Sequence, residues 1–192
     1  MKVKELAGLI KPALEGRPYA PSDAATAVPS AVLIIIHYHP GDTELPRIIL
    51  TRRSANVRSH SSEISFPGGR HSNHDASLLH TALRETKEEI GLGFADHDIL
   101  GSLAAVHTMT SNHFIVPFVT LQRDLPEQKI EVSEVEAVLD LPLLETLQSM
   151  TPDIEHFGLA RDAVKFGYGG NVIWGATARI LKQLHNMLIR PS

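Results

Sequence analysis

The sequence predicts an α/β protein in which short strands and three or four helices follow one another along the chain. Residues 31–37 (AVLIIIH) are a continuous apolar run with β-branched side chains, which indicates a buried strand. Residues 75–90 instead place apolar side chains three and four positions apart, which is the spacing of one helix face. Together these segments predict a mixed sheet combined with helices.

Length and composition favour one domain that spans residues 1–192, of which residues 1–29 form an N-terminal helix and connector. The chain has 192 residues and is 43% apolar, which is enough for one good core. Its net charge is −4 and it has no basic block, so no nucleic-acid partner is expected. The absence of cysteine excludes disulfides and thiol catalysis. Because no signal region or membrane-length apolar run is found, we expect a cytoplasmic protein without a membrane partner.

The N-terminal third predicts a helix followed by two strands. Residues 3–14 have an amphipathic helical pattern that is interrupted near Pro12, and residues 18–29 are an Ala-, Ser- and Pro-rich extended connector. After the first strand, residues 40–46 form a polar loop, and residues 47–53 (RIILTRR) predict a second strand. This order predicts a hairpin within the mixed sheet.

The helix predicted at residues 75–90 carries three carboxylates. Asp75 is a suitable N-cap, because its carboxylate can accept from the free amides of the first turn. One mostly apolar stripe is expected from Leu79, Leu83, Thr86 and Ile90. Gly91 ends the helix. Glu85, Glu88 and Glu89 fall on the side away from the stripe, and their spacing lets them converge on one point.

Carboxylates held this close repel one another, and a bound cation removes the repulsion. Their hard oxygen donors suit Mg²⁺ or Mn²⁺ better than zinc. The alternative is a solvated acidic face, with Arg84 and Lys87 softening the repulsion without any metal.

Residues 66–92 resemble the Nudix box, and the segment RETKEEIGL at 84–92 resembles its core. The matching positions are Gly69, Asp75, Arg84, Glu85, Glu88, Glu89, Gly91 and Leu92. The acidic position holds Asp75 instead of glutamate, and its spacing to Arg84 is one residue longer than the common form. Thr86 stands where the family has an apolar residue.

The segment upstream of the box resembles the signature of the coenzyme A pyrophosphatase branch of this family. The matching positions are Leu50, Thr51, Arg53, Ser54, Arg58, Phe66, Pro67, Gly68 and Gly69. Ser62 stands where that branch has glycine, and Glu63 stands where its members often have glutamine.

The residues of this segment also make chemical sense as a phosphate site. Arg53 and Arg58 can give charge-assisted bonds to phosphate oxygens, and His60 could add a donor. Gly68 and Gly69 let the backbone approach a ligand closely. The alternative is that both arginines are surface charges and that His60 is a plain polar loop residue.

The rest of the chain supplies further elements. Strands are expected at residues 98–107, 113–121, 131–139 and 163–168, and helices at residues 142–149 and 172–189. Pro117 implies an edge strand or a bulge. In Nudix enzymes a downstream acidic residue sometimes adds a metal ligand or acts as a base, and Glu131 and Glu134 are the candidates here. Their alternative is a solvated strand face.

The resemblance implies the Nudix α/β/α sandwich, with a mixed sheet between helices. It also implies a pyrophosphatase that cuts coenzyme A or acyl-coenzyme A to phosphopantetheine and adenosine 3′,5′-bisphosphate. Glu85, Glu88 and Glu89 would hold Mg²⁺ or Mn²⁺, with Glu88 or Glu89 as the base. Arg84 would brace the glutamates.

Two other functions stay open at this point. One is a Nudix pyrophosphatase acting on ADP-ribose or a dinucleotide. The other is a Nudix-like module that binds a nucleotide without catalysis, although such a module has no need of three clustered carboxylates. In each case the ligand is a small nucleoside diphosphate derivative, and a homodimer is left open.

Overall fold

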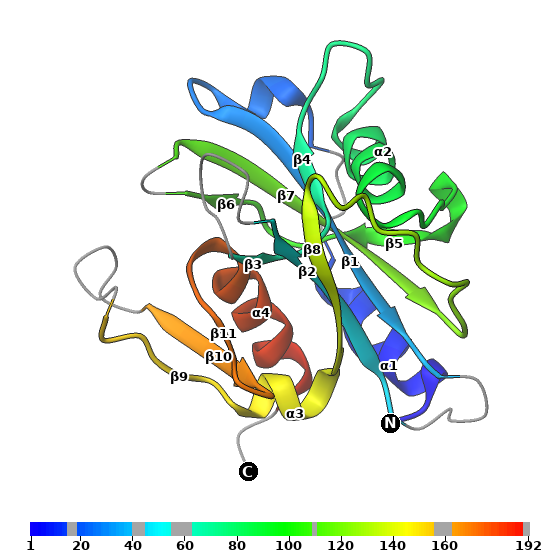
Figure 1. Ribbon diagram of the computed structural model, residues 1–192, viewed down its shortest axis with the longest axis vertical. Helices are drawn as coiled ribbons and strands as arrows, with labels where there is room; N and C mark the ends of the chain where they lie inside the picture. The colour runs from blue at the N-terminus through cyan, green and yellow to red at the C-terminus, as the bar shows by residue number, and fades with distance from the viewer. Residues whose placement is uncertain (15–18, 40–44, 55–62, 109–110, 156–162, 190–192) are drawn as a thin grey trace.

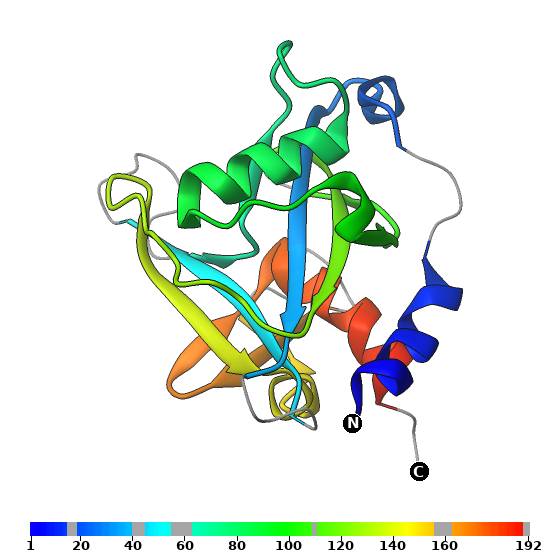
Figure 2. The same ribbon diagram turned by 90° about the vertical axis from the view of Figure 1, so that its right-hand side faces the viewer.

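The computed structural model describes residues 1–14, 19–39, 45–54, 63–108, 111–155 and 163–189. It confirms the predicted α/β class, because a large mixed sheet lies between helices on both of its sides (Figures 1 and 2). None of the helices in the described part of the chain has the length and apolar character that a bilayer span requires.

The N-terminal helix follows the sequence prediction closely. Helix α1 (Val3–Ile10) ends before Pro12, and a 3₁₀ turn, η1 (Lys11–Ala13), carries this proline. Proline cannot continue a helix interior because it lacks an N–H group. The connector is not extended throughout, since a second 3₁₀ turn, η2 (Pro21–Ala24), precedes the first strand.

The large sheet is built around β1 (Val28–His37). Strand β1 pairs in parallel with β7 (His113–Gln122), and antiparallel with β2 (Arg47–Arg53) and β4 (Gly68–Arg70). The predicted hairpin of β1 and β2 is therefore confirmed. The remaining strands of this sheet are β3 (Ile64–Ser65) and β8 (Val135–Pro142) on β2, and β5 (Ile99–Ser102) and β6 (Val106–His107) on β7.

Helices cover both faces of β1, which explains its continuous apolar sequence. Leu33 and Ile35 belong to the core under α2 (Leu78–Ile90). Ile34 and Ile36 point to the other face, where they share a core with α1, α3 (Leu143–Gln148) and α4 (Gly175–Leu188). In Figure 2 the green α2 lies above the sheet, and the blue α1 and red α4 lie below it.

Pro117 lies in the interior of the sheet, so the prediction of an edge strand is wrong. Strand β7 has β1 on one side and β5 and β6 on the other. The alternative prediction, a bulge, is confirmed: the pairing moves from Ser102 with Phe118 to Val106 with Ile115, leaving one more residue on the partner side. This break divides the single strand predicted at 98–107 into β5 and β6, after the short turn η3 (Asp96–Asp98).

The C-terminal part contains a small second sheet of β9 (Thr151–Pro152), β10 (Val164–Tyr168) and β11 (Asn171–Ile173). The sequence predicts a helix from residue 172, but Gly169 and Gly170 turn the chain back with positive φ angles of 56° and 82°. Residues 171–173 therefore pair with β10, and α4 begins only at Gly175.

Candidate active site

Two glycines bring strand β4 and helix α2 together, each for a different reason. A Cβ on Gly68 would lie 2.3 Å from the backbone oxygen of Ala31, and its φ of +148° also favours glycine. A Cβ on Gly69 would lie 2.6 Å from the carboxyl carbon of Glu85. Gly68 thus allows β4 to pair with β1, and Gly69 leaves the space that the Glu85 carboxylate occupies.

Helix α2 begins later than the sequence analysis predicts, so Asp75 is not its N-cap. The N-cap is Ser77, whose hydroxyl oxygen accepts from the His80 N–H at 3.3 Å. Asp75 precedes the helix and closes a turn, accepting from the Ser72 N–H at 3.0 Å. A serine directly before the apolar Leu78 is the sequence signal that could have identified this cap.

The buried face of α2 also differs from the predicted stripe. Its buried members are Leu78, Thr81, Ala82, Thr86, Glu89 and Ile90. Leu79 and Leu83 are only half-buried at the margin of the same core. Thr86 is tolerated inside because its hydroxyl donates to the Ala82 carbonyl at 2.7 Å. The prediction that Glu89 lies on the solvent side of the helix is therefore wrong, because Glu89 faces the sheet.

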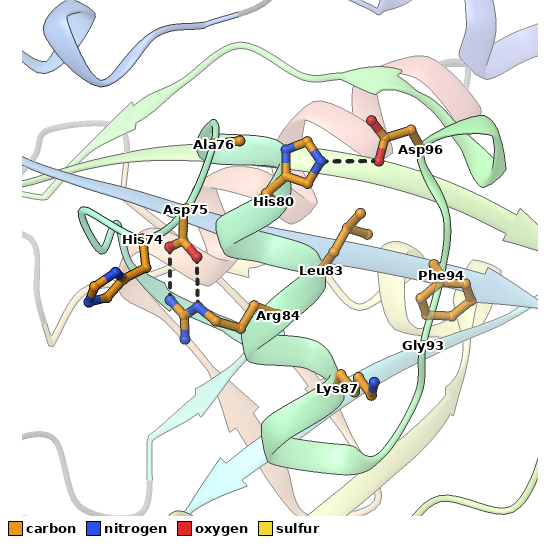
Figure 3. Close-up of a pocket in the computed structure, with 10 residues that line it drawn as sticks. All are labelled: His74, Asp75, Ala76, His80, Leu83, Arg84, Lys87, Gly93, Phe94 and Asp96. Atoms are coloured by element: carbon orange, nitrogen blue, oxygen red, sulfur yellow. Dashed lines mark hydrogen bonds and ion pairs between the residues drawn. The ribbon is translucent and has the colours of Figure 1, made fainter.

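Arg84 braces the acidic cluster through three carboxylates. Its guanidinium donates to both oxygens of Asp75 at 2.8 and 3.0 Å (Figure 3), and it contacts Glu85 at 2.9 Å and Glu88 at 2.8 Å. These hydrogen bonds from Arg84 hold the pKa of Asp75 well below its usual range. Neither the shorter side chain of Asp75 nor the longer spacing to Arg84 prevents the pair from forming.

Glu89 is an ionisable group in an environment that disfavours its charge. Only 6% of the residue is exposed. Burial raises the pKa of Glu89 to about 7, although the Gly68 N–H, which donates to Oε2 at 3.1 Å, and the charge of Arg53 act in the opposite direction. Burial also raises the pKa of Glu85, despite its contact with Arg84. Two carboxylates whose charged forms are disfavoured by burial therefore lie near each other, since the charge of Glu85 also raises the pKa of Glu89.

The predicted phosphate-binding residues are only partly within the described structure. Arg53 ends β2 and lies close enough to Glu89 to lower its pKa, and its Nε is buried without a hydrogen-bond partner among the described residues. A buried donor of this kind is costly unless a ligand oxygen accepts from it. Arg58 and His60, like Ser62, lie outside the described residues.

The two downstream candidates separate clearly. Glu131 is exposed and accepts from the Ser133 hydroxyl at 2.8 Å and from the Ser133 N–H at 3.2 Å. The charge of Glu134 instead adds, after burial, to the raised pKa of both Glu85 and Glu89, so Glu134 lies within electrostatic range of these two carboxylates.

A family model described as the NUDIX domain matches residues 28–157, which include the whole of this site. The chain belongs to the Nudix family. It is 33% identical over 171 residues to a Nudix hydrolase named NudL from Yersinia enterocolitica, which covers 88% of this chain and 85% of the relative. It is also 33% identical over 142 residues to a NudL of Photorhabdus laumondii, covering 72% and 75% of the two chains.

Solved structures of Nudix proteins share the fold. The NUDIX domain of Shewanella oneidensis NrtR, in complex with ADP ribose, has a TM-score of 0.59 and 18% identity, and covers 88% of this chain and 94% of that chain. A MutT/nudix family protein from Enterococcus faecalis has a TM-score of 0.57 and 12% identity, with 95% and 72% covered. Both confirm the Nudix fold expected from the sequence.

Nudix hydrolases cleave phosphoric anhydrides and generally require a divalent cation, typically Mg²⁺. Among the residues that the structure describes, no three acidic or imidazole side chains are already arranged around a metal position. Glu88, whose side chain is 58% exposed, instead contacts Arg84. The donors nevertheless fit, because Glu85 and Glu89 are neighbouring hard oxygen ligands. Burial raises the pKa of both carboxyls, and a bound cation would stabilise their charged forms.

A surface cavity of about 410 Å³ lies between α2 and the segment that follows this helix (Figure 3). Leu83, Lys87 and Phe94 line it, and a contact of 3.5 Å between His80 and Asp96 crosses one end. Asp75 and Arg84 reach its margin, but Glu85 and Glu89 do not line it. The hollow is therefore separate from the acidic cluster.

Proposed function

We propose that this protein hydrolyses the pyrophosphate bond of coenzyme A or acyl-coenzyme A, giving phosphopantetheine and adenosine 3′,5′-bisphosphate. One observation carries the proposal. Arg53, which belongs to the segment that resembles the coenzyme A pyrophosphatase signature, lies close enough to Glu89 of the Nudix box to lower the pKa of that carboxyl, and its buried Nε has no hydrogen-bond partner among the described residues. The residue that would recognise the substrate is thus next to the residue that would act on it.

Glu85, Glu88 and Glu89 would hold Mg²⁺ or Mn²⁺. A bound divalent cation neutralises pyrophosphate charge and lowers the pKa of a coordinated water. The Gly68 N–H donates to Glu89, and the missing side chain of Gly69 leaves the space that the Glu85 carboxylate occupies. Glu88 is exposed and would have to leave Arg84 to join them.

A carboxylate of the same cluster would accept the proton of the attacking water, and Glu88 and Glu89 are the two candidates. Glu89 has the more suitable environment, because burial brings its pKa to about 7, near the value at which a general base is most effective. Glu88 has better access to solvent. Displacement would occur in line at one phosphorus atom.

The arginines divide into two roles. Arg53, together with Arg58, would steady the phosphate oxygens and the charge that develops on them. Arg84 has its donors occupied by Asp75, Glu85 and Glu88, so it would position carboxylates without touching the substrate. Gly68 and Gly69 would allow the backbone to lie close to the ligand.

We further infer that residues 1–192 act as a single domain. Leu6 and Ile10 of α1 share one core with Leu181 and Leu184 of α4, which supports treating residues 1–29 as part of the same folding unit. A cytoplasmic location and a homodimer stay predictions of the sequence.

Product analysis by chromatography tests the function. The pure protein is incubated with coenzyme A, ADP-ribose or NADH, with Mg²⁺, Mn²⁺ or chelator, and a Glu89→Gln variant serves as the inactive control. Metal-dependent release of adenosine bisphosphate from coenzyme A is the expected result. Faster cleavage of ADP-ribose or NADH would assign the second candidate, which Ser62 and Glu63 keep open because they depart from the signature. No cleavage of any of them would favour a non-catalytic nucleotide-binding module.

A further inference from the structure

Residues 129–134, here called the capping segment, cap the C-terminal end of helix α2. The Lys129 N–H donates to the Ile90 carbonyl and the Glu131 N–H donates to the Glu89 carbonyl, both at 2.9 Å. Such carbonyls have no partner within the helix itself. A Cβ on Gly91 would lie 2.9 Å from the Cβ of Lys129, so this glycine leaves room for the segment. The capping segment is therefore bonded directly to the backbone of Glu89.

The other end of the capping segment reaches the strand that carries Arg53. The Ser54 N–H donates to the Glu134 carbonyl at 3.0 Å, one residue after Arg53. The charge of Glu134 adds to the raised pKa values of Glu85 and Glu89, so its carboxylate lies within electrostatic range of both. Residues 132 and 133 thus lie between an anchor on the backbone of Glu89 and an anchor one residue after Arg53, the two residues between which the pyrophosphate is expected to bind.

The capping segment exposes two large apolar side chains at this border. Val132 is 77% exposed and Ile130 is 40% exposed. The other strongly exposed large apolar residues of the described structure lie elsewhere, at Leu45, Ile154, Tyr168 and Val172. Apolar area next to a charged site gains free energy only when something apolar covers it.

We propose that Val132, with Ile130 beside it, forms an apolar rim that contacts the pantetheine arm of coenzyme A. The inference rests on the proposed function and names the part of the substrate that this segment recognises. In coenzyme A the arm begins, one carbon from the phosphate ester, with a carbon that bears two methyl groups. ADP-ribose has a hydroxylated sugar at the same distance. A rim of valine and isoleucine close to the pyrophosphate matches the methyl groups and offers nothing to the sugar.

The test compares three variants of the full chain with the parent. For each, kcat/KM for coenzyme A and the inhibition constants of its two products are measured. Val132→Ser should lower kcat/KM for coenzyme A about 5-fold, mainly through KM, because part of one valine side chain loses its apolar contact. It should raise the inhibition constant of phosphopantetheine, which contains the arm. The inhibition constant of adenosine 3′,5′-bisphosphate, which lacks the arm, should stay unchanged. Val132→Ile keeps an apolar side chain, so its kcat/KM for coenzyme A and its inhibition constant for phosphopantetheine should match those of the parent.

Ile154→Ser is the matched control, because Ile154 is 80% exposed but lies beside β9, away from helix α2. It should leave kinetics unchanged, and melting temperatures of all variants should match the parent. Unchanged kinetics in Val132→Ser would overturn the inference. So would an equal weakening of both product inhibitors, which would mean that the segment acts only by supporting Glu89.

The two proposals fail in different ways. If the parent protein releases no adenosine bisphosphate from coenzyme A, the proposed function fails and this inference falls with it. If the parent cleaves coenzyme A but Val132→Ser does so equally well, only the inference fails.

Discussion

Glu89 is buried, yet in the proposed reaction it has to carry charge to bind a cation, and these two demands are opposed. The Gly68 N–H and the nearby Arg53 supply part of the compensation, but burial still raises its pKa to about 7. A group that is this costly to ionise without a partner contributes little to stability. Its environment is therefore better explained by chemistry than by folding.

Replacing Glu89 by glutamine should lower kcat at least ~10²-fold, the scale on which a major electrostatic element is lost. Glutamine keeps the shape and can still accept from Gly68, so we expect the melting temperature to stay the same or rise. Steady-state kinetics with saturating Mg²⁺ and a thermal melt provide the measurement. Glu155→Gln is the control, since that exposed glutamate contacts Lys165 and lies beside β9; near-normal turnover of Glu89→Gln would mean that the site is placed wrongly.

The two glycines of β4 should respond differently to alanine. In Gly69→Ala the new Cβ meets the far end of the Glu85 side chain, which can move aside, so activity should drop by ~10-fold or more while stability changes little. In Gly68→Ala the Cβ meets the Ala31 backbone at a φ of +148°. Such strain costs roughly 3 kcal/mol, or a melting temperature lower by about 6–12 °C.

Thermal melts and kcat measured on the same two preparations check this contrast. The explanation would be wrong if Gly69→Ala lost its fold or if Gly68→Ala kept the parent melting temperature.

At the scale of elements, α2 is positioned by contacts at both ends. Near its N-terminal end, Thr81 donates to Asp75 at 2.9 Å, and Asp75 holds Arg84. At its C-terminal end, the capping segment bonds to the carbonyls of Glu89 and Ile90. The helix can therefore present its carboxylates in fixed directions, which catalysis by positioned charge requires.

Arg84→Lys should weaken this arrangement although the charge is kept. A single ammonium group cannot contact Asp75, Glu85 and Glu88 with the planar fork that arginine provides. We expect kcat to fall ~10-fold or more, and the melting temperature to fall by about 3–12 °C, as for one charge-assisted hydrogen bond lost. Kinetics and a melt measure both effects; full activity in the lysine variant would show that the brace is dispensable.

Local sequence patterns predicted most elements but not their exact limits or partners. Gly91 correctly ended α2, whereas Asp75 was assigned the cap that Ser77 provides, since both residues satisfy the same capping chemistry. The predicted start of the last helix was wrong, because residues 171–173 follow a pair of glycines and pair with β10 as a hairpin. Helical periodicity gives no information about such strand pairing. The clustering of Glu85 and Glu89 followed from spacing alone, but the burial of Glu89 depends on Gly68 in another strand.

For the whole molecule, the sheet separates chemistry from scaffold. The face under α2 carries the acidic cluster, while the opposite face packs α1, α3 and α4 into one core. The parallel pairing of β1 with β7, far apart in sequence, connects the two halves, and no local pattern could predict it. Stability should therefore depend on contacts that join distant strands.

One such contact joins three strands at the end of the sheet away from β4. Asp140 of β8 accepts from His37 of β1 at 3.0 Å and from Arg47 of β2 at 2.9 Å, and the His39 ring lies beside that of His37. Burial alone would raise the pKa of Asp140, but the hydrogen bonds and charges of His37 and Arg47 outweigh it. The pKa of Asp140 is therefore lowered on folding.

A carboxylate with a lowered folded-state pKa stabilises the protein above its unfolded pKa of about 4, and this contribution is lost as pH falls through the folded value. Asp140→Asn should therefore lower the melting temperature at pH 7 by about 3–10 °C, the value of a hydrogen bond to a charged group. The difference from the parent should shrink as pH falls below about 4. Asp96→Asn alters an exposed carboxylate that contacts His80 at 3.5 Å; it is the control and should have little effect. A difference that stays constant between pH 7 and pH 3 would mean that packing at position 140, and not its charge, joins these strands.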